Sequence, residues 1–245
     1  AGMIGQKLLN LVLSKKKIQN QDVSEITLFD IIESPYPLDT SIPISVKSGD
    51  ISNPQTSSDL VSTRPDVIFH LAAIVSGQAE QEFDLGWNIN ARGSWGLFEA
   101  IRHLGDDYCP RVVFTSSIAV FGAPFPDKIP DDFFTTPLTS YGAQKAISEL
   151  LLADYSRKGM IDGVSIRLPT ICVRPGKPNL AASGFFSGII REPLNGKEAI
   201  LPVSTEVRHW HATPRSAAGF LIHASEIDTS TLNNRITLNM PGLSV

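Results

Sequence analysis

Four short apolar runs, separated by longer stretches of helical periodicity, constrain the fold of this chain more than any other feature. The runs cover residues 25–30, 66–71, 111–117 and 163–168. Between them, apolar residues recur at helical spacing from Phe83 to Leu104 and from Ile147 to Tyr155. Strands that alternate with helices form βαβ units. The sequence therefore predicts an α/β fold of the Rossmann type, with a doubly wound parallel sheet.

The pattern changes after Leu168, where prolines and glycines interrupt any long periodic segment. The interrupting residues are Pro169, Pro175, Pro178, Gly184 and Gly188. A second apolar run follows near Phe220. Because proline and glycine mark loops and turns, we expect residues 1–168 to form the Rossmann domain. Residues 169–245 are then mainly a small substrate-binding region.

The first residues, Ala-Gly-Met-Ile-Gly, place Gly2 and Gly5 at the start of a predicted helix. A glycine turn that binds pyrophosphate normally follows a strand in the middle of the sheet. We therefore expect this first strand to be missing, so that the sequence is an N-terminally truncated Rossmann domain. Two glycines alone are weak evidence, because a helix cap or a packing contact explains them equally well.

Composition excludes several classes of function. The chain of 245 residues has a net charge of −4 and a sequence pI near 5.7, which argues against a nucleic-acid partner. Its apolar runs are shorter than the roughly 20 residues that span a bilayer. The two cysteines, Cys109 and Cys172, lack the paired spacing of a zinc site. We expect a cytoplasmic protein that binds neither membrane nor metal.

Asp30 ends the first predicted strand and indicates the cofactor. A carboxylate in this position accepts hydrogen bonds from the adenosine ribose and repels the 2′-phosphate of NADP. Asp30 therefore favours NAD, although it lies further from the glycines than the usual distance of about 20 residues. A carboxylate that caps a turn at a strand end is the alternative.

Tyr141 and Lys145 form a possible general-base pair. Residues four apart share one face of a helix, and a nearby ammonium favours the phenolate form of tyrosine. Ser117 ends a buried strand, at the edge where open α/β sheets bind ligands. A solvated helix face and a turn cap are the alternatives for these residues, so their context decides.

Further motifs occur in a characteristic order along the chain. They are Gly49-Asp50-Ile51, His70-Leu71-Ala72-Ala73, Asn90-Ala91-Arg92-Gly93, Ser116-Ser117-Ile118-Ala119-Val120-Phe121-Gly122 and Tyr141-x-x-x-Lys145. With them, the sequence resembles the extended short-chain dehydrogenase/reductases, which include nucleotide-sugar epimerases and dehydratases. The resemblance implies that Ser117, Tyr141 and Lys145 are catalytic. The NAD-binding residues that it implies are Gly2, Met3, Ile4, Asp30, Asp50, Ile51, Leu71, Ala72, Ala73, Asn90, Tyr141, Lys145, Pro169 and Thr170.

Residues 72–77 and 167–194 resemble one branch of this family more closely. Its enzymes oxidise a four-carbon sugar acid, D-erythronate, at C2 to the 2-oxo acid. The branch has longer chains, so we also expect truncation at the C-terminus. The substrate residues that we expect are Ser76, Ser117, Ile118 and Tyr141, with Arg174, Arg191, Arg208 and Arg215 as candidates for the carboxylate. The sequence does not choose among these arginines, each of which a surface salt bridge also explains.

His209 and His211 do not form a convincing metal site, because two histidines without a third ligand are weak evidence. Surface or packing roles explain them better.

The resemblance implies a mechanism in which Tyr141, as phenolate, takes the C2 hydroxyl proton while hydride passes from C2 to NAD. Lys145 and the nicotinamide lower the pKa of Tyr141, and Ser117 orients the reacting oxygen. A nucleotide-sugar epimerase or dehydratase would instead return the hydride to its substrate, and an NAD-sensing module would transfer none. Net NADH production separates these alternatives. The family also implies a homodimer, formed by the helices of residues 87–104 and 141–155.

Overall fold

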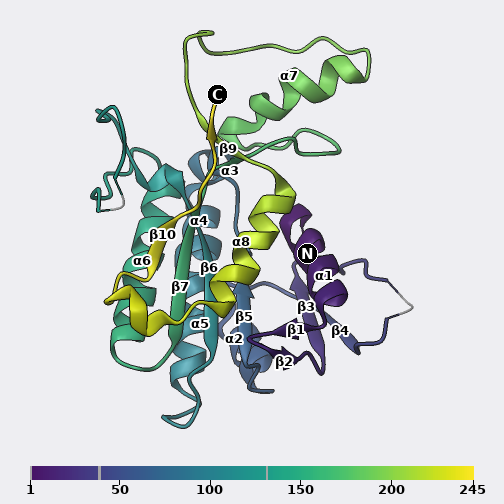
Figure 1. The fold of residues 1–245 in the computed structure, drawn as a ribbon, viewed down its shortest axis with the longest axis vertical. Helices are drawn as coiled ribbons and strands as arrows, with labels where there is room; N and C mark the ends of the chain where they lie inside the picture. Colours follow the sequence, from purple (N-terminus) through teal and green to yellow (C-terminus); the bar gives the residue numbers. More distant parts are fainter. Residues whose placement is uncertain (1, 38–39, 131) are drawn as a thin grey trace.

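The computed structural model of the chain describes residues 2–37, 40–130 and 132–245. At its centre lies a four-stranded parallel sheet with the order β10-β7-β6-β5 (Figure 1). Its strands are β5 (Val67–His70), β6 (Arg111–Ser117), β7 (Asp162–Leu168) and β10 (Thr237–Asn239). The apolar runs predicted the first three with nearly these bounds. They did not predict β10, which is short and half-buried.

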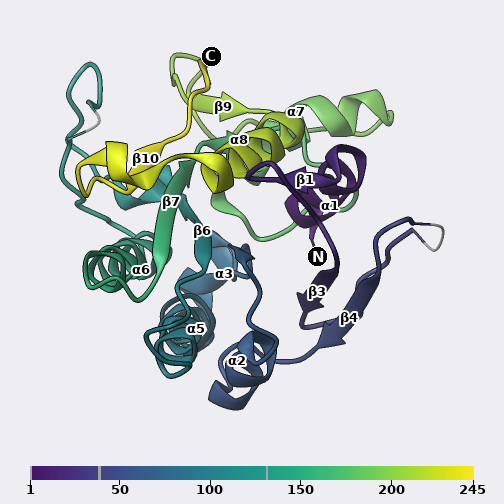
Figure 2. The ribbon, with the colours of Figure 1, turned by 60° about the horizontal axis from the view of Figure 1, so that its bottom comes forward.

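Helices cover both faces of this sheet (Figure 2). One face carries α2 (Pro54–Val61), α5 (Gly93–Arg102) and α6 (Ser140–Arg157), and the other carries α1 (Met3–Lys15) and α8 (Pro214–Glu226). Along β6, Val112 and Phe114 pack with α5 and α6, whereas Val113 packs with α1 and α8. A strand that is covered on both faces is apolar throughout. The prediction of a doubly wound parallel sheet is confirmed.

The predicted helix from Phe83 to Leu104 is a series of helical segments. It consists of α4 (Phe83–Gly86), a π-helical turn η1 (Trp87–Arg92) and α5. A short helix, α3 (Ser76–Gln81), precedes it. Hydrophobic periodicity detects the continuous helical direction but not the change of hydrogen bonding inside it. Such π-turns occur frequently at functional sites, and this one contains Asn90.

Two parallel strands, β3 (Ile26–Asp30) and β4 (Ile44–Ser48), form a separate sheet beyond the hairpin of β1 (Lys17–Ile18) and β2 (Gln21–Asp22). Within the described ranges, no strand pairs with both β3 and β5, so this pair and the central sheet remain separate. The expected strand before Gly2 stays a prediction. β4 was not predicted, because Ile44 and Val46 alone give too short an alternation.

The segment after β7 contributes to two parts of the molecule. β8 (Thr170–Ile171), β9 (Trp210–Ala212) and β11 (Leu243–Ser244) form a small sheet, and α7 (Phe185–Leu194) follows η3 (Ala182–Gly184) at the top of Figure 1. In contrast, α8 and β10 return to the central sheet and its core. The domain boundary after residue 168 therefore stays a prediction.

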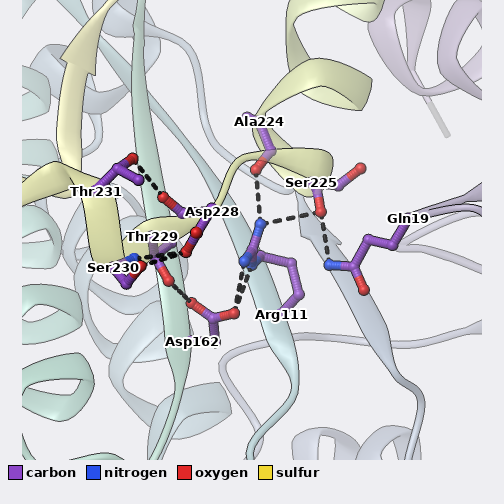
Figure 3. A network of polar contacts seen from close by, with 9 residues as sticks. All are labelled: Gln19, Arg111, Asp162, Ala224, Ser225, Asp228, Thr229, Ser230 and Thr231. Atoms are coloured by element: carbon purple, nitrogen blue, oxygen red, sulfur yellow. Dashed lines mark hydrogen bonds and ion pairs between the residues drawn. The ribbon is translucent and has the colours of Figure 1, made fainter.

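A buried arginine joins the amino ends of β6 and β7 to the end of α8 (Figure 3). The Arg111 Nε and Nη2 atoms lie 3.0 and 2.6 Å from Asp162 Oδ2, and Nη1 donates to the carbonyls of Ala224 and Ser225 at 3.1 and 2.9 Å. This network fixes the end of the sheet opposite Ser117. Across the described residues, no helix is both long enough and apolar enough to span a membrane.

Candidate active site

Ser117 and Tyr141 come together because the end of β6 meets the start of α6. Ser117 caps the short helix η2 (Ile118–Val120), where its Oγ accepts the Ala119 N–H at 3.1 Å. Thr139 caps α6 and accepts the Gly142 N–H at 3.1 Å. A Cβ on Gly142 would lie 2.1 Å from the Ala119 carbonyl oxygen. Only glycine therefore allows the first turn of α6 to pack this closely on η2.

The pKa of Tyr141 reflects burial and two neighbouring groups. Burial raises this pKa above its ordinary value, while a hydrogen bond with the Ser117 side chain and the positive charge of Arg174 lower it. The structure thus brings the predicted Ser117 and Tyr141 side chains together. The charge of Arg174, one of the four arginines that the sequence named, also acts on Tyr141.

Lys145 lies beneath Tyr141 and is 2% exposed. Its Nζ donates to the Thr115 carbonyl at 2.7 Å and lies 5.7 Å from the centre of the Tyr141 ring. Burial lowers the pKa of Lys145 to about 7, and the negative charge of Glu149 opposes this change. Such an amine exchanges protons near neutral pH. The predicted pair is therefore present in space as well as in sequence.

Asn90 ties the π-turn to the loop after β5. Its Oδ1 accepts the Ile74 N–H at 2.8 Å, and its Nδ2 donates to the Ile74 carbonyl at 3.2 Å and to Gln144 Oε1 at 2.7 Å. Asn90 is 1% exposed, so these bonds satisfy its buried amide. We infer that Asn90 positions the predicted cofactor loop 71–73 through this contact.

The other residues predicted to bind NAD gather at the carboxyl ends of the strands. Asp30 ends β3, Asp50 and Ile51 follow β4, Leu71 to Ala73 follow β5, and Pro169 and Thr170 follow β7. Asp30 Oδ1 accepts the Ile31 N–H at 2.7 Å, and Asp50 Oδ1 accepts the Ser52 N–H at 2.8 Å. Ligands of open α/β sheets bind at this edge.

The start of α1 suits a phosphate group. Gly2 is the N-cap residue, with no side-chain cap and no acidic residue in the first turn. A Cβ on Gly2 would meet nothing within 4 Å. The N–H groups of the first turn, including those of Met3 and Ile4, therefore face no competing carboxylate of their own helix. These residues fit the pyrophosphate of a dinucleotide.

The predicted substrate residues separate into several places. Ser76 Oγ accepts the Ala182 N–H at 3.0 Å, which joins α3 to η3. Arg191 pairs with Glu192 and donates to the Arg174 carbonyl at 2.7 Å. Arg208 and Arg215 are exposed, and Ile118 is half-buried beside Ser117. Of the four arginines, Arg174 is the one whose charge acts on Tyr141.

Sequence reasoning missed two groups of polar residues. Glu149, Arg167 and Ser116 form a buried cluster next to Lys145, and the signal was a glutamate four residues after Lys145 on the same helix face. His209 Nε2 lies 2.7 Å from Thr170 Oγ1. The sequence predicts only a surface or packing role for His209. In the residues that the structure covers, no group of three or more His, Cys, Asp or Glu could hold a metal ion.

The family model for the NAD-dependent epimerase/dehydratase family matches residues 1–226. Two D-erythronate dehydrogenases match the whole chain. The protein from Cupriavidus necator is 47% identical and that from Haemophilus influenzae is 40% identical, and the match covers 76% of each. The resemblance that the motifs predicted is confirmed.

Solved structures agree with the fold. A protein described as a nucleoside-diphosphate-sugar epimerase from Agrobacterium tumefaciens is 57% identical, with a TM-score of 0.95 over 100% of this chain and 72% of its own. The holo form of a GalE-like L-threonine dehydrogenase from Cupriavidus necator is 21% identical, with a TM-score of 0.83 over 100% of this chain and 76% of its own. At that identity it supports the fold alone. With the motifs in order and the sheet as predicted, this chain belongs to the NAD-dependent epimerase/dehydratase family.

Proposed function

We propose that this protein is an NAD-dependent dehydrogenase that oxidises D-erythronate at C2 to 2-dehydro-D-erythronate. The observation that carries the proposal is the contact of Tyr141 with Ser117, above buried Lys145 and in the field of Arg174. A hydroxyl and a carboxylate on neighbouring carbons of a small acid match this combination of a base and a cation. The two whole-chain relatives named D-erythronate dehydrogenase support the substrate.

In this proposal Tyr141 removes the proton of the C2 hydroxyl. The Ser117 hydroxyl donates to the reacting oxygen and holds it near the Tyr141 oxygen. Lys145 stabilises the phenolate, because its ammonium lies under the ring. NAD, when bound, supplies the acceptor for the hydride that leaves C2. Arg174 holds the carboxylate of the substrate, which fixes C2 in place.

The alternative within the same family is a nucleotide-sugar epimerase or dehydratase, which regenerates its NAD in each cycle. The description of the Agrobacterium tumefaciens relative favours this alternative. A non-catalytic NAD sensor is less well supported, since Ser117, Tyr141 and Lys145 are all present.

The experiment mixes the protein with NAD and offers D-erythronate, L-threonate, D-threonate and UDP-glucose separately. We expect NADH absorbance to rise fastest with D-erythronate. A higher rate with either threonate would correct the stereochemistry of the substrate. Absence of NADH with all three acids would reject the dehydrogenase, and interconversion of UDP-sugars without net NADH would establish the epimerase.

We also infer a homodimer that forms through α5 and α6. Apolar side chains on and near these helices are exposed, with Leu150 at 70%, Phe83 at 55% and Trp95 at 51%. Clusters of exposed apolar residues mark protein interfaces.

We further place the protein in the cytoplasm, where thiols such as those of Cys109 and Cys172 stay reduced. Residues 1–168 would bind NAD and residues 169–245 mainly the substrate.

A further inference from the structure

A buried ionic cluster includes a residue one helical turn from Lys145 on α6. Glu149, one helical turn further along α6, is 4% exposed. Arg167 on β7 donates a hydrogen bond to each oxygen of its carboxylate, with Nε 2.9 Å from Oε1 and Nη2 2.7 Å from Oε2. The Ser116 hydroxyl donates a further hydrogen bond to Oε1. The Glu149 carboxylate is therefore held at both oxygens and shielded from solvent.

The cluster connects the elements that carry the predicted catalytic residues. Ser116 and Arg167 are register partners on β6 and β7, and Ser116 directly precedes Ser117. Lys145 and Glu149 lie four residues apart on α6, so they share a face. A buried ion pair contributes little net stability compared with apolar residues of similar volume. Its position beside Lys145 therefore calls for a second explanation.

The groups around Lys145 differ in their effect on its charge. His70 on β5 is neutral, because burial and the charge of Lys145 lower its pKa to about 3. Arg167 on β7 is cationic, but its guanidinium is bound to Glu149. Tyr141 and Glu149 are the titratable neighbours on α6. Of these, the negative charge of Glu149 raises the pKa of Lys145 against the effect of burial.

We propose that Glu149 is a positioning residue of the dehydrogenase, whose carboxylate, bound by Arg167 and Ser116, favours the ammonium form of Lys145 beneath Tyr141. This inference rests on the proposed function, since the ammonium form of Lys145 matters to the reaction only if Tyr141 acts as a phenolate base. It adds a residue to which sequence reasoning gave no role. Arg167 and Ser116 act through Glu149, because both bind its carboxylate.

The test replaces the carboxylate with a neutral group of the same size, Glu149→Gln. We would follow the NMR chemical shift of the Lys145 ε-carbon against pH in lysine-labelled protein, without substrate. In the native protein the midpoint should lie near the pKa of about 7. Loss of a nearby negative charge disfavours the ammonium, so the variant midpoint should fall by about one pH unit.

The same change should move the alkaline limb of kcat/KM for D-erythronate to lower pH. If Lys145 must be protonated, a fall of about one pH unit means a loss of about tenfold above the midpoint. An unchanged midpoint in Glu149→Gln would overturn the role of Glu149, whether or not the protein oxidises D-erythronate. If the midpoint falls in Glu149→Gln but the native protein makes no NADH from D-erythronate, the proposed function alone is rejected.

A matched control exists at the opposite end of the same two strands (Figure 3). Asp162 pairs with buried Arg111 at the amino ends of β6 and β7. Asp162→Asn should lower the melting temperature yet leave the Lys145 midpoint unchanged. A shift of the midpoint in this control as well would reject a specific role of Glu149.

A second variant keeps the test decisive if Glu149→Gln alone does not fold. In Glu149→Gln/Arg167→Met, the arginine that would lose its partner is also removed, which avoids an unpaired buried charge. The Lys145 midpoint should still lie below that of the native protein, because the carboxylate is gone. A native-like midpoint in the folded double variant would overturn the proposal.

Discussion

Tyr141 and Lys145 face opposite effects of the same burial. Loss of water disfavours both the phenolate and the ammonium, so it raises the pKa of the first and lowers that of the second. Neighbouring groups oppose each change, with Ser117 and Arg174 acting on Tyr141 and Glu149 acting on Lys145. The reactive form of the site therefore depends on residues that surround the pair.

Tyr141→Phe removes the proposed base and keeps the ring that packs over Lys145. We expect the rate of NADH formation to fall by about 10²–10⁴-fold, the usual contribution of general base catalysis. The affinity for NAD, measured by isothermal titration calorimetry, should stay almost unchanged. Activity retained near the native level would remove Tyr141 as the base.

His70 makes the stability of the fold dependent on pH. Its Nε2 lies 2.9 Å from Ser94 Oγ, and the Ser94 hydroxyl donates to the Asn90 carbonyl at 2.6 Å. The ring must then donate from Nε2. Its pKa falls to about 3 in the folded protein, through burial and the charge of Lys145, against an unfolded value of 6.5.

The sign of the effect follows from proton uptake. Below pH 6.5 the unfolded chain binds a proton at His70 that the folded protein does not, so stability falls as the pH falls towards about 3. Between pH 6.5 and pH 5 this amounts to about 2 kcal/mol. Urea unfolding should show the loss in the native protein and a smaller one in His70→Gln. Equal losses in both proteins would contradict the assignment.

At the scale of elements, the site depends on how closely α6 approaches η2. The helix begins at Ser140, and Gly142 lies against the Ala119 carbonyl in its first turn. Tyr141 and Lys145 both belong to α6, while Ser117 belongs to β6. Any displacement of the helix start therefore separates the proposed base from the hydroxyl that orients the substrate.

Gly142→Ala tests this dependence. The added Cβ would lie 2.1 Å from the Ala119 carbonyl oxygen, so helix and turn must move apart. A misplacement of about 1 Å can cost about 10²-fold in rate, and we expect a loss of that order in kcat for NADH formation. The control is Gly219→Ala in α8, where a Cβ meets nothing within 4 Å. Equal activities of the two variants would show that the contact is unimportant.

At the scale of the whole molecule, the helices of one sheet face are not fully covered. α5 and α6 bury one side against β6 and expose Trp95 and Leu150 on the other. Trp95 Nε1 also lies 3.2 Å from Tyr155 OH, which connects the two helices at their outer surface. A second copy of the chain would cover this surface in the proposed homodimer.

Leu150→Glu should weaken that dimer, because a charge would enter an apolar interface. We expect light scattering with size-exclusion chromatography to give a dimer mass for the native protein and a larger monomer fraction for the variant. The control is Leu194→Glu at the end of α7, where Leu194 is 81% exposed. The helix α7 lies away from α5 and α6 (Figure 1). A monomeric native protein would contradict the homodimer.

Much of the fold and of the candidate site could be predicted from the sequence. Hydrophobic periodicity and composition are local properties of the sequence, so the apolar runs predicted β5, β6 and β7. The ordered motifs predicted the family and the placement of Ser117, Tyr141 and Lys145. The sequence also predicted NAD from Asp30. It could not predict β10, which takes its place only by pairing with β7.

The tertiary structure alone decided which charged groups share a buried space. Glu149, Arg167 and Ser116 lie on three different elements. The spacing of Glu149 from Lys145 shows that these two share a helix face, but nothing in the sequence reveals that Arg167 and Ser116 meet Glu149. The four candidate arginines were equivalent as residue types until the fold set Arg174 to act on Tyr141 and Arg191 to pair with Glu192. Side-chain periodicity gives the face of an element, whereas electrostatic coupling depends on distances across elements that only packing determines.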